Sequence, residues 1–270
     1  MHTHQAQLIT AETHVLPSTL LKREVTLSIY FPATNHARAE MDLLLINDGQ
    51  DLATMRFADI LSDLYSSHLI KPVFFVGISC GPDRKNEYGT AHLLDYKGRG
   101  TKALVYQQFI FGELLPFIYK NYAHVSHAEK SFCGFSLGGL SALDTVWNHP
   151  KEFKNVGVFS GSLWWRRISQ HHHLFNEDRD RIIHNHIRGG HFYPWLRFFF
   201  ETGTLDEIAD RNKNGIIDSI DDTVSLIDEL LRKGYDRDKN IYYLELKDGK
   251  HDVPTWGKAF PYFLKWCWGF

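Results

Sequence analysis

The chain has 270 residues, a hydrophobic content of 43% and a formal net charge of −2. This apolar fraction suffices for one large core, and the near-neutral charge gives no reason to expect nucleic acid or an acidic membrane surface as a partner. No run approaches the roughly 18 apolar residues of a membrane span, so we expect no membrane segment.

The N-terminus and the cysteines indicate the cellular compartment. Residues 1–5 lack the charged and apolar regions of a signal peptide, which predicts a cytoplasmic protein. Cys80, Cys133 and Cys267 are an odd number without metal-ligand spacing, so no disulfide framework is expected.

Apolar patterning predicts strands and helices that alternate along the chain. Residues 24–31 alternate polar and apolar, as in a half-buried strand, whereas 41–46 and 72–78 are continuous apolar runs typical of interior strands. Helical spacing is found at 53–66 and 105–118. The later expected elements are strands at 131–133, 155–160, 195–202 and 241–246, and helices at 140–147, 222–233 and 256–266. Such alternation predicts an α/β protein with a mostly parallel sheet covered on both faces, in a single domain over 1–270.

A G-x-S-x-G sequence at Gly134–Gly138 lies between a predicted strand and a predicted helix. In that context the motif is typical of a nucleophile elbow, in which a sharp turn exposes the hydroxyl of Ser136. Glycines are required because side chains would crowd the turn. Taken alone, the motif is equally compatible with a glycine-rich strand-to-helix turn.

Two further residues complete the chain order Ser, Asp, His of α/β-hydrolases. Asp206 follows the buried strand and Gly-Thr turn that begin at Trp195, and His251 follows the predicted strand 241–246. Catalytic residues of open α/β sheets lie beyond the carboxyl ends of strands. We therefore predict Ser136 as nucleophile, His251 as general base and acid, and Asp206 as the carboxylate that orients the imidazole. Glu207 and Asp252 are alternatives for the acid, and a surface histidine is the alternative interpretation of His251.

Residues 163–194 form a segment rich in tryptophan and histidine. They include Trp164, Trp165 and six histidines, the triplet at 171–173 among them. No His-x₃-His pair accompanies a carboxylate, so a polar insertion that forms a lid or wall of the site is favoured over a metal site.

The chain resembles the putative-esterase family of α/β-hydrolases, which includes esterase D, enterochelin esterases and feruloyl esterases. The shared motifs run through almost the whole chain: Asn47-Asp48-Gly49-Gln50, Asp83-Arg84 with Glu87-Tyr88, Gly98-Arg99-Gly100, Glu113–Ile118, Gly134–Gly139, Phe159–Ser162, Gly203–Asp206, and His251-Asp252 with Trp256. The resemblance implies an α/β-hydrolase fold and carboxylic ester hydrolysis, and it supports Asp206 over Glu207.

Further site residues follow from the loops of this resemblance. An oxyanion hole requires two converging backbone N–H groups, for which we predict Leu137 and Gln50. Arg84 and Tyr88 match a family loop near the pocket, where substrate contact and an ion pair between Arg84 and Glu87 are both open. Trp164 and Trp165 either stack against substrate or pack in the wall.

A second motif occupies 210–221. Oxygen-bearing side chains at positions 1, 3, 5, 9 and 12 surround a glycine at position 6, which is the spacing of an EF-hand loop with aspartate at the end. We predict structural calcium, with an Asx-turn loop without metal as the alternative. The expected ligands are Asp210, Asn212, Asn214, the Ile216 carbonyl, Asp218 and Asp221.

The predicted function is a serine esterase that forms an acyl-enzyme on a small, aromatic-acyl or sugar-linked ester, with no cofactor for catalysis. The alternatives are an acyltransferase of the same fold and a catalytically silent binding protein. The expected partner is a small-molecule ester. The oligomeric state and the substrate's acyl and alcohol parts are not set by the sequence.

Overall fold

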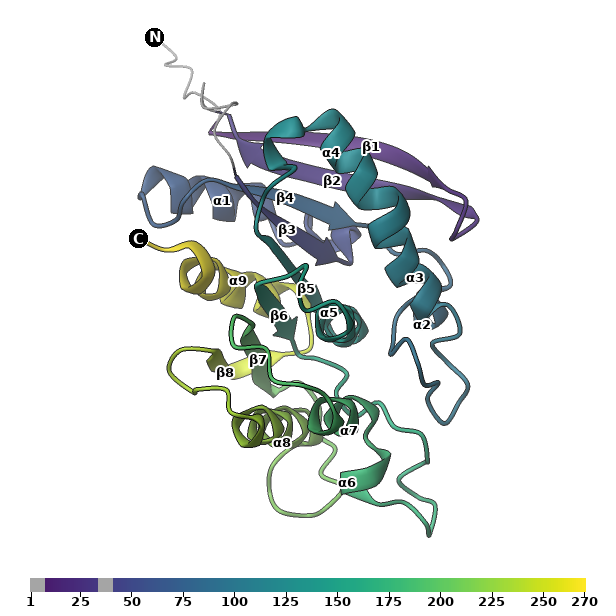
Figure 1. Cartoon of the computed structure of the whole chain (residues 1–270). Coiled ribbons are helices and arrows are strands. Elements are labelled where there is room, and N and C mark those ends of the chain that lie inside the picture. Colours follow the sequence, from purple (N-terminus) through teal and green to yellow (C-terminus); the bar gives the residue numbers. More distant parts are fainter. Residues whose placement is uncertain (1–7, 34–40) are drawn as a thin grey trace.

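A computed structural model describes residues 8–33 and 41–270. An eight-stranded sheet forms its centre, in the order β1-β2-β4-β3-β5-β6-β7-β8 (Figure 1). The strands are β1 (Ile9–Ser18), β2 (Arg23–Pro32), β3 (Asp42–Asn47), β4 (Val73–Ile78), β5 (Lys130–Phe135), β6 (Asn155–Phe159), β7 (Arg197–Leu205) and β8 (Ile241–Lys250). Residues 1–5, on which the cytoplasmic prediction rests, lie outside the described residues.

The sheet is mostly parallel, as predicted. β2 pairs antiparallel with β1 and β4, and every other neighbouring pair is parallel. All six residues of Val73–Ile78 are buried, which is the reason for their continuous apolar sequence. The parallel strands therefore place their carboxyl ends along one edge of the sheet.

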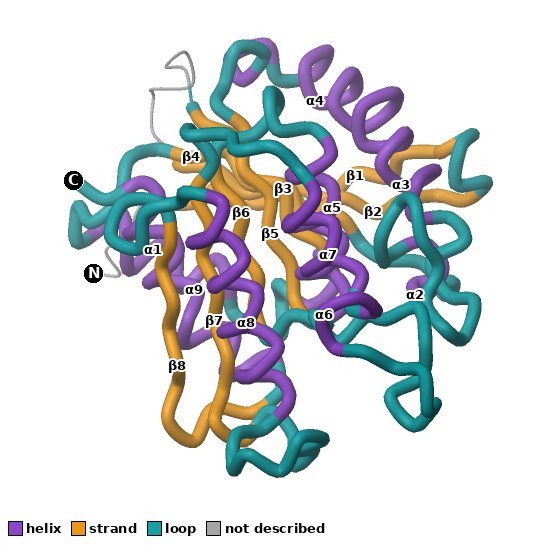
Figure 2. Tube along the Cα trace, turned by 60° about the horizontal axis from the view of Figure 1, so that its bottom comes forward, coloured by secondary structure: helices purple, strands orange, loops and turns teal. Residues whose placement is uncertain are grey.

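Helices cover both faces of the sheet (Figures 1 and 2). The longer helices are α1 (Phe57–Ser66), α3 (Ala103–Phe109), α4 (Leu115–Asn121), α5 (Leu137–Asn148), α7 (Ile182–Gly189), α8 (Asp218–Lys233) and α9 (Val253–Trp268). A π-helical turn at Ile110–Leu114 joins α3 to α4, and the short α2 (Arg84–Glu87) and α6 (Glu177–Asp180) lie in loops. Three-residue 3₁₀ turns occur at Gly49–Asp51 and Ala123–Val125.

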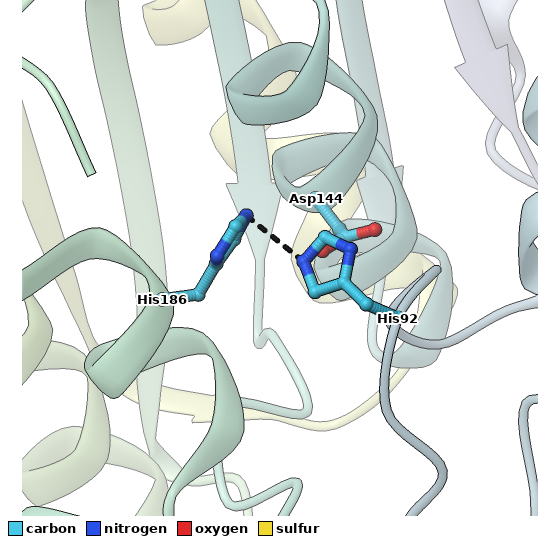
Figure 3. Close-up of side chains that lie close together, drawn as sticks. All are labelled: His92, Asp144 and His186. Atoms are coloured by element: carbon cyan, nitrogen blue, oxygen red, sulfur yellow. Dashed lines mark hydrogen bonds between the residues drawn. The ribbon is translucent and has the colours of Figure 1, made fainter. Parts of the chain in front are cut away.

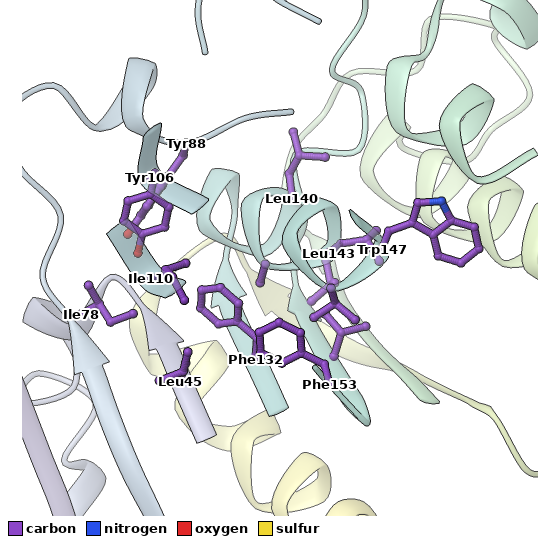
Figure 4. Packing of buried hydrophobic residues seen from close by; sticks show 14 of the residues in the cluster. Leu45, Ile78, Tyr88, Tyr106, Ile110, Phe132, Leu140, Leu143, Trp147 and Phe153 are labelled. Carbon is purple, nitrogen blue, oxygen red and sulfur yellow. The ribbon is translucent and has the colours of Figure 1, made fainter. Parts of the chain in front are cut away.

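Two hydrophobic clusters lie on opposite sides of the sheet. Leu43 and Leu45 belong to the cluster under α3, α4, α5, α7 and α8, whereas Leu44 and Ile46 belong to the cluster under α1 and α9. This alternation is the period of two that a strand buried on both faces requires. Figure 4 shows Leu45 and Phe132 of the sheet packed toward Ile110 and Leu143.

The segment 163–194, predicted to be a polar insertion that forms a lid or wall of the site, contains α6 and α7. α7 packs beside α8 and α5 rather than standing clear of the domain. Its buried face carries Ile183 and Ile187. The insertion is thus tied to the main core through an apolar surface.

Candidate active site

Ser136 occupies a strained turn between β5 and α5. Its backbone angles are φ 54° and ψ −121°, a conformation that L-residues rarely adopt. A Cβ at Gly138 would lie 2.4 Å from Asp48 Oδ2, and one at Gly134 would lie 2.4 Å from the Gly138 carbonyl oxygen. The two glycines of the motif are therefore required by close packing, and the turn has the conformation expected of an elbow.

The Ser136 side chain lies at the edge where the parallel strands end. It is partly exposed, and its Oγ is 3.4 Å from Oγ of the buried Ser162, in the loop after β6. The Ser162 N–H also donates to the Ser136 carbonyl at 3.1 Å. These contacts hold the loop after β6 against the elbow.

Asp206 directly follows β7, on the same edge. Its Oδ1 accepts a hydrogen bond of 3.0 Å from Ser160 Oγ, and its Oδ2 is buried with no partner among the described residues. Trp256 Nε1 in turn donates to Ser160 Oγ at 2.9 Å. Burial raises the pKa of Asp206, against hydrogen bonds and the charge of His251, which lower it. One carboxylate oxygen is fixed, and the other can accept a further N–H.

His251 directly follows β8. Its ring packs edge-on against Trp256, with 5.4 Å between the ring centroids. His251 is solvent-exposed as a whole residue, but desolvation of its ring lowers its pKa, and the charges of Asp206 and Arg84 act on it in opposite directions. Within residues 8–33 and 41–270, no hydrogen bond joins His251 to Ser136 or Asp206. Because Ser136, Asp206 and His251 directly follow the parallel strands β5, β7 and β8, the structure brings all three to one edge of the sheet.

The two alternative acids have other surroundings. Asp252 caps α9, where its Oδ1 accepts from the Thr255 N–H at 2.9 Å. Glu207 lies near the start of α8, where burial and then the charge of Asp218 raise its pKa. Neither has a link to Ser160 like that of Asp206, so the contacts favour Asp206.

A second carboxyl group, which the sequence did not single out, lies beside Asp206. Glu201 of β7 is buried, and its Oε2 is 3.5 Å from Ser160 Oγ. Burial and the charge of Asp206 raise the pKa of Glu201 to about 8, so this side chain is mostly protonated at neutral pH. Phe159–Ser162 was part of the family resemblance, but only the folded chain shows that Ser160 links Glu201, Asp206 and Trp256.

The two N–H groups predicted for the oxyanion hole come from the elbow and from the turn after β3. Leu137 is the first residue of α5, and Gln50 lies in the 3₁₀ turn after β3. Neither N–H has an acceptor in the described part of the chain. The Gln50 side chain is fixed, since its Oε1 accepts from the Cys80 N–H at 3.1 Å and its Nε2 donates to Asp48 at 3.2 Å.

Arg84 forms an ion pair with Asp48, and not with Glu87 as the predicted alternative had it. Its Nε and Nη2 donate to the two oxygens of the buried Asp48, each at 2.7 Å. Glu87 pairs instead with Arg23, at 2.8 and 2.7 Å. The alternative of an Arg84–Glu87 pair is therefore wrong, because residues of β2 and of the loop after β3 supply the partners.

Of the four predicted substrate-binding residues, two are buried and two are partly exposed. Tyr88 and Trp165 are fully buried, which contradicts direct contact of either side chain with substrate. The hydroxyl of Tyr88 has an internal partner instead: its Oη accepts a hydrogen bond of 3.2 Å from the Asp48 N–H. Trp164 is partly exposed, with the Arg99 guanidinium 5.1 Å from its ring centroid. Trp164 and the partly exposed Arg84 are thus the two that can reach a ligand.

In the predicted calcium loop, most of the expected ligand side chains contact one another or the loop backbone, whereas Asp218 contacts an arginine. Asp210 accepts from the N–H groups of Asn214 and Gly215, at 3.1 and 2.9 Å. Asp221 Oδ2 accepts from the side-chain amides of Asn212 and Asn214, at 2.6 and 3.3 Å. Asp218 instead begins α8 and pairs with Arg211 at 3.2 Å. Positions 1, 3, 5 and 12 are therefore linked within the loop, Ile216 lies in the same turn, and calcium stays a prediction.

The fold, with its candidate residues at the carboxyl edge of the sheet, defines the class of protein, and comparison with known proteins defines the family. The chain has the α/β-hydrolase fold, shared with solved esterase structures. It belongs to the family described as Putative esterase, whose model matches residues 18–267. No helix in the described ranges combines the length and apolar character needed to span a bilayer.

Similar solved structures support this assignment of the fold. The enterobactin esterase FES from Shigella flexneri has a TM-score of 0.72 at 20% identity, over 97% of this chain and 60% of that one. A ferulic acid esterase has a TM-score of 0.68 at 17% identity, over 97% and 98%. The siderophore hydrolase EstB from Aspergillus nidulans has a TM-score of 0.67 at 18% identity, over 98% and 96%.

A curated relative is the uncharacterized protein YjcH of Bacillus subtilis (strain 168). It is 27% identical over 138 residues, which are 50% of this chain and 55% of that protein. The chain thus spans less than two thirds of the length of YjcH and of the FES chain.

Proposed function

We propose that this protein is a serine carboxylic-ester hydrolase in which Ser136, His251 and Asp206 act as a catalytic triad. The observation that carries the proposal is the strained backbone of Ser136, with φ 54° at the junction of β5 and α5. Such strain persists only where the surroundings impose it, and it clusters at active sites. Membership of the esterase family supports the same reaction class.

The proposed reaction proceeds through an acyl-enzyme. His251 takes the proton of Ser136 Oγ as that oxygen attacks the ester carbonyl carbon, and then gives this proton to the departing alcohol. Water, activated by the same imidazole, releases the acid and restores the serine. The unpartnered Oδ2 of Asp206 would accept the second N–H of the imidazole and fix its tautomer.

The N–H groups of Leu137 and Gln50 would stabilise the negative charge that develops on the carbonyl oxygen. Each such preorganised donor contributes about 3 kcal/mol to transition-state stability. The fixed side chain of Gln50 supports this role, because it immobilises the turn that presents the N–H.

For the substrate we propose an ester with an aromatic acyl group. Trp164 is partly exposed and follows the buried Ser162 by two residues, which offers an indole surface near Ser136. Similar solved structures include an esterase of enterobactin and a ferulic acid esterase. The cytoplasmic location and the lack of a nucleic-acid partner stay predictions.

Hydrolysis of p-nitrophenyl acetate tests the reaction class. We expect turnover by the native protein, and a fall in kcat of about 10⁴ or more in Ser136→Ala and in His251→Gln. His127→Gln is a matched control, because His127 is exposed before β5, at the opposite end of that strand, and should leave turnover unchanged.

Labelling by a fluorophosphonate separates the alternatives. Covalent labelling of Ser136, detected by peptide mass, together with turnover supports the hydrolase. Labelling with product that appears only when an alcohol is added would indicate an acyltransferase. Neither labelling nor turnover in a folded protein would refute the proposal in favour of a binding protein.

A further inference from the structure

Two histidines and an aspartate from distant parts of the chain converge away from Ser136. His92 lies in the loop after α2, Asp144 in α5 and His186 in α7 (Figure 3). One ring nitrogen of each histidine and one carboxylate oxygen of Asp144 all lie within 4.8 Å of one another. No other group of three such side chains is as close in the described ranges. Asp144 lies two helical turns beyond Ser136, roughly 12 Å along the axis of α5.

Asp144 is buried with an unbalanced set of partners. Its Oδ2 accepts three hydrogen bonds, from the Ala91 N–H, Gln107 Nε2 and Asn148 Nδ2, at 2.8, 2.8 and 3.0 Å. Its Oδ1 is equally buried and has no partner among the described residues. A buried carboxylate oxygen without a donor is costly, and a bound cation removes that cost.

The two imidazoles face each other through the same type of nitrogen. The Nε2 atoms of His92 and His186 are 3.0 Å apart, and His186 Nε2 is also 2.9 Å from Asn148 Oδ1. Two nitrogens bound to one tetrahedral zinc ion lie roughly 3.3 Å apart, given Zn–N bonds of about 2.05 Å. The rings therefore need to separate only slightly to hold a metal ion between them.

The chemistry of these side chains suits a transition metal. Neutral imidazole is the ligand form, and it is the form that an ordinary histidine mostly has at pH 7. Solvent reaches the rings, since His92 and His186 line a surface pocket of about 440 Å³. Two imidazoles, one carboxylate and one water are an ordinary tetrahedral set for Zn²⁺.

We propose that His92, His186 and Asp144 bind a Zn²⁺ ion that links the loop after α2, α5 and α7. Water from the pocket completes the coordination, and Asn148 Nδ2 orients Asp144. His186 Nε2 gives up its contact with Asn148 Oδ1 when it binds the ion, because a metal-bound nitrogen has no hydrogen to donate. The ion takes no part in ester hydrolysis. It fastens the insertion that contains α7 to the helix that begins next to Ser136.

Zinc titration of the metal-free protein tests this proposal. The full chain is stripped with EDTA, dialysed, and titrated with Zn²⁺ in competition with a chromophoric chelator. We expect one tight equivalent in the native protein and a loss of affinity of more than about tenfold in His92→Ala and in His186→Ala. Zinc should raise the Tm of the native protein and leave the Tm of these variants unchanged.

The chain offers a matched control for adventitious binding. His171, His172 and His173 are outside the cluster, and their joint replacement by alanine should leave the tight equivalent intact. Tight binding that is lost only in this triple variant would overturn the proposal, as would equal affinity in native and His92→Ala protein.

A spectroscopic measurement covers variants that do not fold. Co²⁺ added to the stripped native protein should give the intense visible bands of tetrahedral cobalt, which Zn²⁺ then removes. The spectrum of octahedral cobalt alone, unchanged by zinc, would contradict the site. Because neither readout depends on ester hydrolysis, a failure of the zinc site and a failure of the esterase proposal are distinguishable.

Discussion

Arg84 donates a hydrogen bond to each carboxylate oxygen of Asp48. Asp48 in turn lies close to Gln50 and packs against Gly138 of the elbow. Arg84 Nη2 also donates to the Phe135 carbonyl at 3.3 Å, one residue before Ser136. The loop after β3 and the elbow after β5 are thus joined through one guanidinium. Any shift of this side chain would move the Gln50 N–H relative to Ser136.

Arg84→Met should therefore reduce both stability and activity. It leaves the Asp48 carboxylate buried without its cation, and we expect the free energy of unfolding to fall by about 3 kcal/mol. Urea unfolding gives the stability, and hydrolysis of p-nitrophenyl acetate gives kcat. Arg56→Met is the control, because the Arg56–Asp59 pair is exposed and should contribute less than about 1 kcal/mol. An equal fall in the free energy of unfolding in the two variants would show that the Arg84–Asp48 pair contributes no more than an exposed ion pair.

The pH profile of kcat/KM should report the ionisation of His251. Desolvation lowers the pKa of this imidazole and Arg84 adds to the effect, whereas the charge of Asp206 opposes it, and the net pKa lies below the ordinary histidine value. Since the neutral form is the base, activity should rise with pH, with its midpoint below the ordinary histidine value. A midpoint above 7 in the free enzyme would contradict this environment for His251.

Glu201 should make the protein less stable as pH rises. Its folded-state pKa is about 8, far above the ordinary glutamate value, so the folded chain retains a proton that the unfolded chain loses. This stability is complete below the ordinary glutamate pKa and is lost as pH rises toward 8. Glu201→Gln should be more stable than the native protein at pH 8 by at least about 1 kcal/mol, and nearly equal to it at pH 5. Thermal unfolding at the two pH values measures both differences.

Calcium should stabilise the 210–221 loop. In metal-free protein, Ca²⁺ should raise the Tm, and Asp210→Asn should abolish the rise, because Asp210 accepts two N–H groups that shape the loop. Asp178→Asn, which removes an exposed charge outside the loop, should keep it. Identical melting curves of the native protein with and without Ca²⁺ would favour the Asx-turn loop without metal.

Trp164→Ala should discriminate between substrates. We expect kcat/KM for a feruloyl ester to fall by roughly tenfold or more, with a much smaller change for an acetyl ester, because only the aromatic acyl group stacks on the indole. Trp195→Ala is the control, since this exposed tryptophan precedes β7 at the opposite end of the sheet. A parallel loss on both esters would indicate that Trp164 has a packing role only.

The interior of the fold could be predicted from sequence, whereas its edges could not. Val73–Ile78 is buried at every position, so its apolar run was sufficient. β1 (Ile9–Ser18) was not predicted, because half of the residues in this edge strand are polar and only its two end residues are buried. α8 begins at Asp218 rather than 222, since the side chains assigned to the calcium loop also form its first turn.

The candidate site shows the same division. Ser136, Asp206 and His251 each follow a strand in sequence, and parallel pairing brings those ends to one edge. The partners of Arg84 and the burial of Tyr88 depend on segments far away in the chain, which no local pattern encodes. The same applies to His92, Asp144 and His186, whose spacing resembles no metal motif.

The conformation of Ser136 has a consequence for how such a chain can change over generations. Every folded molecule holds this residue in an arrangement that suits glycine better than any residue with a side chain. Ser136→Gly should therefore yield a sturdier but inert protein. Selection for turnover and selection for durability act in opposite directions at this one position, and a lineage released from the first would be free to drift toward the second.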